Sequence, residues 1–216
     1  MNDSRDDILK RIRLRLGRTE ENAAARWGAI DVVLARRAQG PRPAVEADLV
    51  ARLRSRSEAL ASTVEIVERI EDAPAAAARY LAAHQLPLSA VAWPQLAGLD
   101  WVGAGLQVES RAARGDDLVG ITGVFCAVAE TGSLVGLSGT DTPAANSLLP
   151  ETHIAIVPAA RIVPGMEEVW ALIRAECGDL PRAANFISGP SRTGDIEQTL
   201  VLGAHGPYRV HIVIVR

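Results

Sequence analysis

The sequence has 216 residues, 48% hydrophobic and 23% charged, a balance typical of one globular domain with an appendage or of two small domains. Its net charge of −3 gives no electrostatic indication of nucleic-acid binding, so no nucleic-acid partner is expected. It contains no apolar run near the roughly 20 residues of a membrane-spanning helix and no secretory signal at its N-terminus, so we expect a cytoplasmic protein with no membrane span.

The N-terminal part is expected to form a helical arm. Residues 4–16 have apolar side chains on one helical stripe and arginines on the other face, and residues 23–37 can continue as a second helix. The stretch Gly40-Pro41-Arg42-Pro43 then interrupts the pattern. We therefore predict an arm over residues 1–44 and a domain over residues 45–216.

Helix and strand patterns alternate in the predicted domain. Such alternation favours an α/β fold with a largely parallel sheet. The last apolar run shows little polar alternation and is expected to be a central strand. The expected helices are 46–61, 72–81 and 164–176, and the expected strands are 63–67, 88–93, 153–158 and 210–215, with weaker strand patterns at 101–102 and 106–108.

The middle of the chain, Val119 to Leu137, is almost entirely apolar or small, so both of its faces are expected to be buried. A polar turn, Glu130-Thr131-Gly132-Ser133, interrupts this run, and a hairpin or a kinked strand junction fits it. Glu130 follows an apolar strand and needs solvent, a donor or a ligand, because burying an unpaired carboxylate is costly.

A second polar stretch runs from Ile187 to Glu197 and combines hydroxyls, two glycines, Arg192 and two carboxylates. It follows an expected strand end at Phe186, and Ile196, Leu200 and Leu202 are expected on the buried side of a short helix. Open α/β sheets place ligand sites at such turns, where backbone N–H groups and Arg192 can hold an anion. The alternative is a turn that only caps the helix.

Three polar turns thus follow apolar strands, and in an open α/β sheet such turns can converge on one cleft. The third is His205-Gly206-Pro207. Glu130 can act as a base, a nucleophile or a ligand hydrogen-bonder, or it can simply pair with Arg192 or Arg209. His205 can be a general acid/base or a loop histidine bonded to backbone.

The other histidines and the cysteines are expected to be structural, and the sequence has no known cofactor-binding motif. His153 and His211 lie in expected strands, where a core histidine is the simpler interpretation. Cys126 and Cys177 are the only cysteines, and no Cys, His, Asp or Glu spacing indicates a metal ion or an iron–sulfur cluster. Neither a dinucleotide-binding G-x-G-x-x-G nor a Walker loop is present.

Taken together, these turns resemble the lactate utilization protein C family, also called the LUD domain family. The resemblance covers about residues 45–216, and Gly194 stands where the family pattern leads us to expect alanine. The matching segments are Ile121-Thr122-Gly123, Ala129 to Ser133, Ser147-Leu148-Leu149-Pro150 with His153, Ile187 to Thr193 with Asp195-Ile196-Glu197, and Gly203-Ala204-His205-Gly206-Pro207.

The resemblance implies a three-layer α/β fold similar to the NagB/RpiA/CoA-transferase-like superfamily, with an open and mostly parallel sheet. It also implies bacterial oxidation of L-lactate to pyruvate together with companion proteins that carry iron–sulfur clusters. Since this chain has no cluster ligands of its own, a subunit or accessory role is the first hypothesis. The alternatives are a free-standing acyl-, CoA- or phosphosugar-type transferase or isomerase that uses Glu130, and a non-catalytic assembly module.

The expected site binds a small anion. Glu130 and His205 are its candidate catalytic residues, and no metal ligand is expected. The candidate ligand-binding residues are Thr131, Gly132, Ser133, Ser188, Gly189, Ser191, Arg192, Thr193, Asp195 and Gly206.

Overall fold

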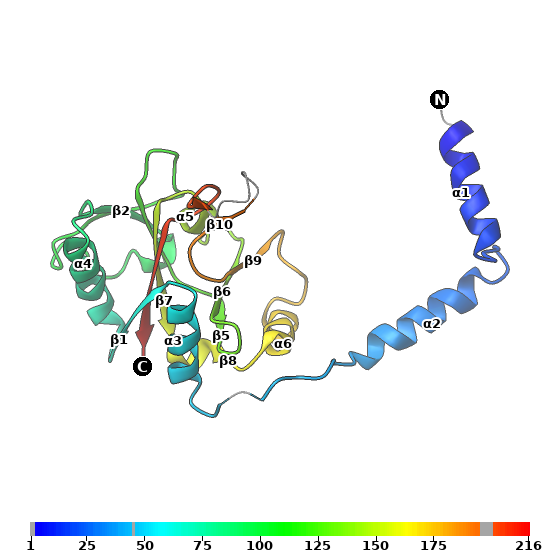
Figure 1. Ribbon diagram of the computed structural model, residues 1–216, viewed down its shortest axis with the longest axis horizontal. Helices are drawn as coiled ribbons and strands as arrows, with labels where there is room; N and C mark the ends of the chain where they lie inside the picture. The colour runs from blue at the N-terminus through cyan, green and yellow to red at the C-terminus, as the bar shows by residue number, and fades with distance from the viewer. Residues whose placement is uncertain (1–2, 45, 195–200) are drawn as a thin grey trace. The chain divides into compact units, whose positions relative to one another are not determined.

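The computed structural model of the protein describes residues 3–44, 46–194 and 201–216. The chain separates into two units, Met1–Arg42 and Pro43–Arg216, and each is described by itself. The first consists of two helices, α1 (Asp3–Arg15) and α2 (Ala23–Arg36). The second contains every strand of the described chain (Figure 1).

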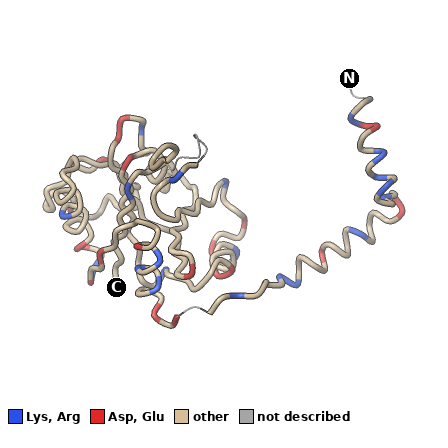
Figure 2. Tube along the Cα trace, in the orientation of Figure 1, with Lys and Arg blue, Asp and Glu red and all other residues tan. Residues whose placement is uncertain are grey.

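The corner between α1 and α2 is held by local hydrogen bonds. The Thr19 N–H donates to Asn22 Oδ1 (3.1 Å), and the Asn22 N–H donates to Thr19 Oγ1 (3.3 Å). No residue of α2 is buried. Residues 1–42 carry ten Lys and Arg against six Asp and Glu, whereas residues 43–216 carry 13 against 20, and basic side chains recur along both helices (Figure 2). The arm is therefore net positive and the second unit net negative.

The second unit is built on a six-stranded, wholly parallel sheet in the order β1-β12-β7-β4-β2-β3. The last strand lies between β1 and β7, as its low polar alternation predicts. The α/β class with a mostly parallel sheet is therefore confirmed. The strands are β1 (Thr63–Val67), β2 (Ser89–Ala92), β3 (Gln107–Ser110), β4 (Val119–Thr122), β7 (Thr152–Pro158) and β12 (Arg209–Val215).

One face of this sheet is covered by helix α4 (Ala73–Ala83), whose alanine-rich surface and Leu81 pack against β4, β7 and β12. Trp101 joins this core and donates its indole N–H to Leu96 O (3.0 Å). The expected strand at Trp101-Val102 is wrong: these residues form a turn, closed by the Leu106 N–H donating to Trp101 O (2.9 Å). The buried indole, rather than strand pairing, accounts for the apolar residue there.

The other face is covered by helix α3 (Leu49–Ala59) and by a second, four-stranded sheet in the order β8-β5-β6-β9. Helix α6 (Met166–Glu176) packs on the outside of this second sheet through Val169 and Ile173. Figure 1 shows these layers in succession from α4 to α6. The strands are β5 (Cys126–Val128), β6 (Ser133–Leu137), β8 (Ile162–Val163) and β9 (Ala184–Ile187).

The apolar run from Val119 to Leu137 is shared between the two sheets. Its first part forms β4 in the main sheet, and β5 pairs antiparallel with β6 in the second sheet. Of the two arrangements that fit the polar turn Glu130 to Ser133, the structure has the hairpin. The short elements are α5 (Ala145–Leu148) and the 3-10 turns η1 (Ile70–Asp72), η2 (Pro94–Leu96) and η3 (Ala159–Arg161).

Strands β10 (Arg192–Thr193) and β11 (Val201–Leu202) form a small antiparallel ladder of their own. Leu202 pairs with Arg192 and is 44% exposed, so its expected place on the buried side of a helix is wrong. Strand pairing with β10 prevails over the weak helical spacing at this position. The other two residues of that expected helix, Ile196 and Leu200, lie outside the described residues.

Candidate functional site

The polar turns gather near the amino edge of the main sheet. The 203–207 turn directly precedes β12, the segment from α5 to Glu151 precedes β7, and the C-terminal end of α3 precedes β1. In Figure 1, α5 and β10 lie at the end of the sheet opposite to the C-terminus. The expected placement of the three turns after strands of one open sheet is wrong, because β5 and β9 belong to the second sheet and β11 to a separate ladder.

Two of the turns meet through a chain of hydroxyl groups. Thr131 Oγ1 lies 2.7 Å from Ser133 Oγ, which lies 2.6 Å from Ser188 Oγ. The cause is the antiparallel pairing of β6 with β9, in which Leu134 is opposite Ile187, so the adjacent residues Ser133 and Ser188 are neighbours. Long-range strand pairing thus brings three of the predicted site residues together.

Two predicted site glycines allow these turns to pack against helix α3. Gly132 has φ +71°, and a Cβ atom there would lie 2.9 Å from the Ser57 backbone N. Gly189 has φ +81°, and a Cβ atom would lie 2.5 Å from Leu60 O. Both backbones occupy the left-handed region that favours glycine. Close approach to α3 therefore explains why glycine stands at both positions.

Arg192 is held at the C-terminal end of the same helix. Its Nη2 donates to Leu60 O (3.1 Å), where the partial negative charge of a helix end favours a cation. The side chain is exposed, and its neighbour Thr193 pairs with Val201 across the small ladder. Among the described residues, Arg192 forms no ion pair with Glu130, so the suggested pairing of these two is not observed.

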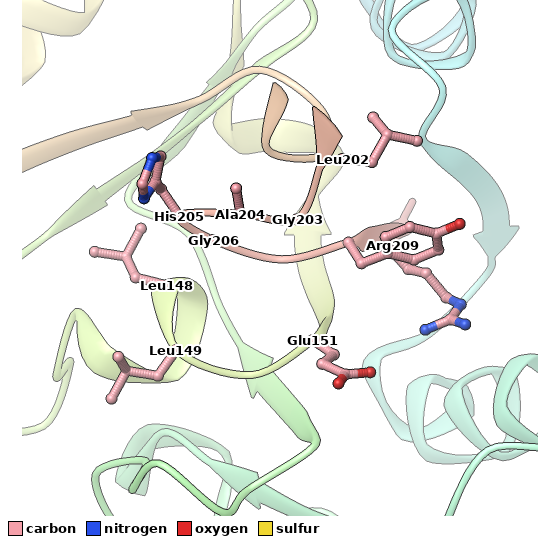
Figure 3. A pocket seen from close by; sticks show the side chains of 10 residues that line it. Leu148, Leu149, Glu151, Leu202, Gly203, Ala204, His205, Gly206 and Arg209 are labelled. Carbon is pink, nitrogen blue, oxygen red and sulfur yellow. The ribbon is translucent and has the colours of Figure 1, made fainter. Parts of the chain in front are cut away.

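The third turn packs against the second through Ser191. The Ser191 N–H donates to Pro207 O (2.9 Å), and the Gly203 N–H donates to Ser191 O (2.9 Å). Beside this contact is an open hollow of about 640 Å³, in which Figure 3 shows His205 at one end and Arg209 at the other. The hollow is lined by Leu148, Leu149, Glu151, Leu202, Gly203, Ala204, His205, Gly206, Tyr208 and Arg209.

Glu130 does not line this hollow. It is half-buried directly after β5, and its backbone N–H donates to Pro164 O (3.0 Å). Its carboxylate makes no hydrogen bond or ion pair within the described ranges of the chain. The two candidate catalytic residues, Glu130 and His205, are therefore not joined by a direct contact. Asp195, a further candidate, lies outside the described residues.

His153 and His211 lie in the core of the main sheet, as the sequence predicted. His153 Nε2 is 2.8 Å from Thr122 Oγ1, and His211 Nδ1 is 2.8 Å from Thr63 Oγ1. Burial lowers the pKa of each imidazole to about 4. His211 also stacks on Tyr80, with ring centroids 4.1 Å apart. Both histidines are therefore neutral structural groups near neutral pH.

Sequence reasoning missed the role of Asn146 and the positions of Glu151 and Arg209. Asn146 is fully buried: its Oδ1 accepts from the Ala113 N–H (3.0 Å), and its Nδ2 donates to Arg111 O (2.9 Å). It therefore ties α5 to the loop before β4. Arg209 was considered only as a partner for Glu130, and nothing in the local pattern singled out Glu151.

Among the residues that the structure describes, no three His, Cys, Asp or Glu side chains gather in a way that could hold a metal ion. No helix there combines the length and apolar composition needed to cross a membrane.

Comparison with known proteins identifies relatives that match about half of the chain. A "Lactate utilization protein C" from Bacillus licheniformis is 38% identical over 127 residues, which cover 53% of this chain and 53% of the relative. Proteins with the same name from Halalkalibacterium halodurans and Bacillus subtilis are 41% identical over 114 residues and 42% identical over 100 residues. These two alignments cover 51% and 45% of this chain, and 49% and 42% of the relatives. The chain thus spans about half the length of the curated relatives it matches.

The fold also matches a solved structure. The crystal structure of a DUF162 family protein from Deinococcus radiodurans superposes with a TM-score of 0.60 at 22% sequence identity. The match covers 81% of this chain and all of that one. The family model described as the LUD domain matches residues 50–215, which is well over half of the sequence. The chain therefore belongs to the LUD domain family.

Proposed function

We propose that this chain is a subunit or accessory protein of an iron–sulfur-dependent system that oxidises L-lactate to pyruvate. The observation that carries the proposal is the similarity to proteins named lactate utilization protein C, at 38–42% identity over about half of the chain. The clusters are assigned to partner proteins. Cys126 is buried, burial raises its thiol pKa to about 11, and a single further cysteine cannot complete the usual four-thiolate set.

The role assigned to this chain is to bind a small carboxylate where the turns meet. The hydroxyls of Thr131, Ser133 and Ser188 have three O–H donors, and two of these are used in the hydrogen bonds between them, so one O–H can donate to the carboxylate. Arg192 uses one of its five N–H donors on Leu60 O, which leaves others for the ligand. A charge-assisted hydrogen bond of this kind contributes about 1.5–3 kcal/mol.

The site is tested by growth on L-lactate as the sole carbon source, after deletion of the gene and complementation with variants. Arg192→Ala is expected to abolish growth on lactate and to leave growth on glucose unchanged. Arg182→Ala is the matched control, because it removes an exposed arginine of the same unit outside the turns. Circular dichroism checks that both variants are folded. Normal growth of Arg192→Ala on lactate would remove Arg192 from the site.

The partnership is tested separately. The full chain, purified with a tag from lactate-grown cells, is expected to bring down proteins that contain iron and acid-labile sulfide. Purification of the chain alone under these conditions would contradict the proposed association.

A second candidate function is a free-standing transferase or isomerase. It is favoured by the Glu130 carboxylate, which ends an apolar strand and has no partner in the described part of the chain. Turnover of an acyl-CoA or a phosphosugar by the purified chain, lost in Glu130→Gln, would support this alternative over the subunit role. Activity that requires the companion proteins would support the first proposal.

A further inference from the structure

We propose that the hollow at the amino edge of the main sheet, between α5 and the 203–207 turn, binds a phosphate ester whose remaining part is flat or apolar. This inference concerns Arg209 and the backbone of residues 204–206. It does not depend on lactate being the substrate of the system. Three features of the hollow carry it: a cation, a set of backbone donors and an apolar wall.

The cation is Arg209, the first residue of β12. Its backbone N–H donates to Glu151 O (3.0 Å), which holds the residue in place. Its guanidinium lies over the Tyr208 ring, 4.8 Å from the centroid, and makes no hydrogen bond or ion pair to the part of the chain that the structure describes. Arg192, by contrast, already donates to Leu60 O. Within the described residues, all guanidinium donors of Arg209 thus remain available to a ligand, whereas Arg192 already uses one of its donors.

The backbone donors belong to Ala204, His205 and Gly206. In this turn, the hydrogen bonds to described residues use only the Gly203 N–H and the Pro207 carbonyl. The three consecutive N–H groups between them have no such partner, and all three residues line the hollow. Successive free N–H groups in a glycine-containing turn are a typical way to hold a phosphate. The backbone and Arg209 thus supply anion-binding groups from two directions.

The apolar wall consists of side chains that are unusually exposed. Leu148 is 39% exposed, Leu149 57%, Leu202 44% and Tyr208 46%, and all four line the hollow. Figure 3 shows the three leucines. Large apolar side chains that cluster around a concave surface often mark a binding site. A bare phosphate ion would leave this wall exposed, so the wall favours a ligand with a flat or aliphatic body.

Size and the remaining charge are consistent with such a ligand. A volume of about 640 Å³ lies in the range of about 300–1,000 Å³ that is usual for sites of drug-sized molecules. Glu151 is the acidic residue of the hollow, and its side chain lies at the Arg209 end in Figure 3. There it can accept a hydrogen bond from a ligand hydroxyl, while the phosphate lies between the Arg209 guanidinium and the N–H groups of the turn.

The test uses the purified full chain and three probes: inorganic phosphate, ADP and uncharged adenosine. Isothermal titration calorimetry measures affinity, and amide NMR shifts locate the site. We expect saturable binding of ADP that is tighter than binding of phosphate or adenosine, with the largest shifts at Ala204, His205 and Gly206. Arg209→Gln is expected to weaken ADP binding about tenfold or more, since it removes a charge-assisted contact. Arg209→Lys should restore part of the affinity.

Arg182→Gln is the matched control, because it removes one exposed arginine elsewhere on the same unit. Thermal melts of all variants show whether the fold is kept. The proposal is overturned if neither phosphate nor ADP binds, if Arg209→Gln binds ADP as the wild type does, or if Arg182→Gln loses as much affinity. It is equally overturned if the shifts lie away from the 203–207 turn.

Discussion

Replacing Gly189 with alanine is expected to disturb the contact between the 188–193 segment and helix α3. The backbone of Gly189 has φ +81°, and the new Cβ atom would meet Leu60 O at 2.5 Å and Leu60 Cβ at 3.1 Å. Leu60 O also accepts the hydrogen bond from Arg192 Nη2. The substitution therefore forces the backbone carbonyl of Leu60, directly after α3, to move, and it disturbs the arginine of the proposed site as well.

The cost has two parts. An L-residue in the left-handed region costs about 1–2 kcal/mol, and crowding against a packed backbone costs about 1–3 kcal/mol more. The free energy of unfolding should thus fall by about 2–5 kcal/mol. For a domain of this size each kcal/mol lowers the Tm by about 2–4 °C, so a drop of at least about 4 °C is expected.

Urea unfolding of the full chain, followed by circular dichroism, measures this difference. Gly194→Ala is the control from the same stretch, because its φ is outside the left-handed region and a Cβ atom there meets no atom of the described residues within 4 Å. The control should unfold within about 0.5 kcal/mol of the wild type. If Gly189→Ala were as stable as Gly194→Ala, the packing explanation for this glycine would be wrong.

Three further predictions concern the core and the hydroxyl chain. Since burial lowers the pKa of His153 and His211 to about 4, the unfolded chain binds more protons below pH 6.5, and stability should fall from about pH 6.5 to pH 4 by up to about 3 kcal/mol per histidine. An NMR titration that shows either ring protonating near pH 6.5 would contradict this. Asn146→Ala leaves the Ala113 N–H and Arg111 carbonyl without their partner, so urea unfolding should show a loss of about 2–4 kcal/mol; unfolding like the wild type would refute that role. A double-mutant cycle of Ser133→Ala and Ser188→Ala should give a coupling of about 0.5–1.5 kcal/mol in urea unfolding, and additive effects would exclude a hydrogen bond that matters for stability.

Much of the fold could be predicted from local patterns. The β-branched run at residues 63–67, the helical spacing at 164–176 and the apolar strand at 210–215 each form the expected element. The polar turn at Glu130 to Ser133 closes the expected hairpin. These predictions hold because hydrophobic periodicity, secondary-structure propensity and turn residues are all local features of the sequence. Such features can be recognised without knowing what each element packs against.

The partners of each element could not be predicted in this way. The apolar composition of Val119 to Leu137 indicates that this run is buried, but it does not indicate which sheet the run joins. In the structure the run is divided between the main sheet and the second sheet. The meeting of Ser133 with Ser188 depends on the pairing of β6 with β9, about 50 residues apart in sequence. The turns lie near the amino edge because β9 and β11, which precede two of them, are not strands of the main sheet. Composition and spacing therefore specify which groups this chain offers to a ligand, while long-range strand pairing, driven by burial of both sheet faces, determines which of those groups lie together.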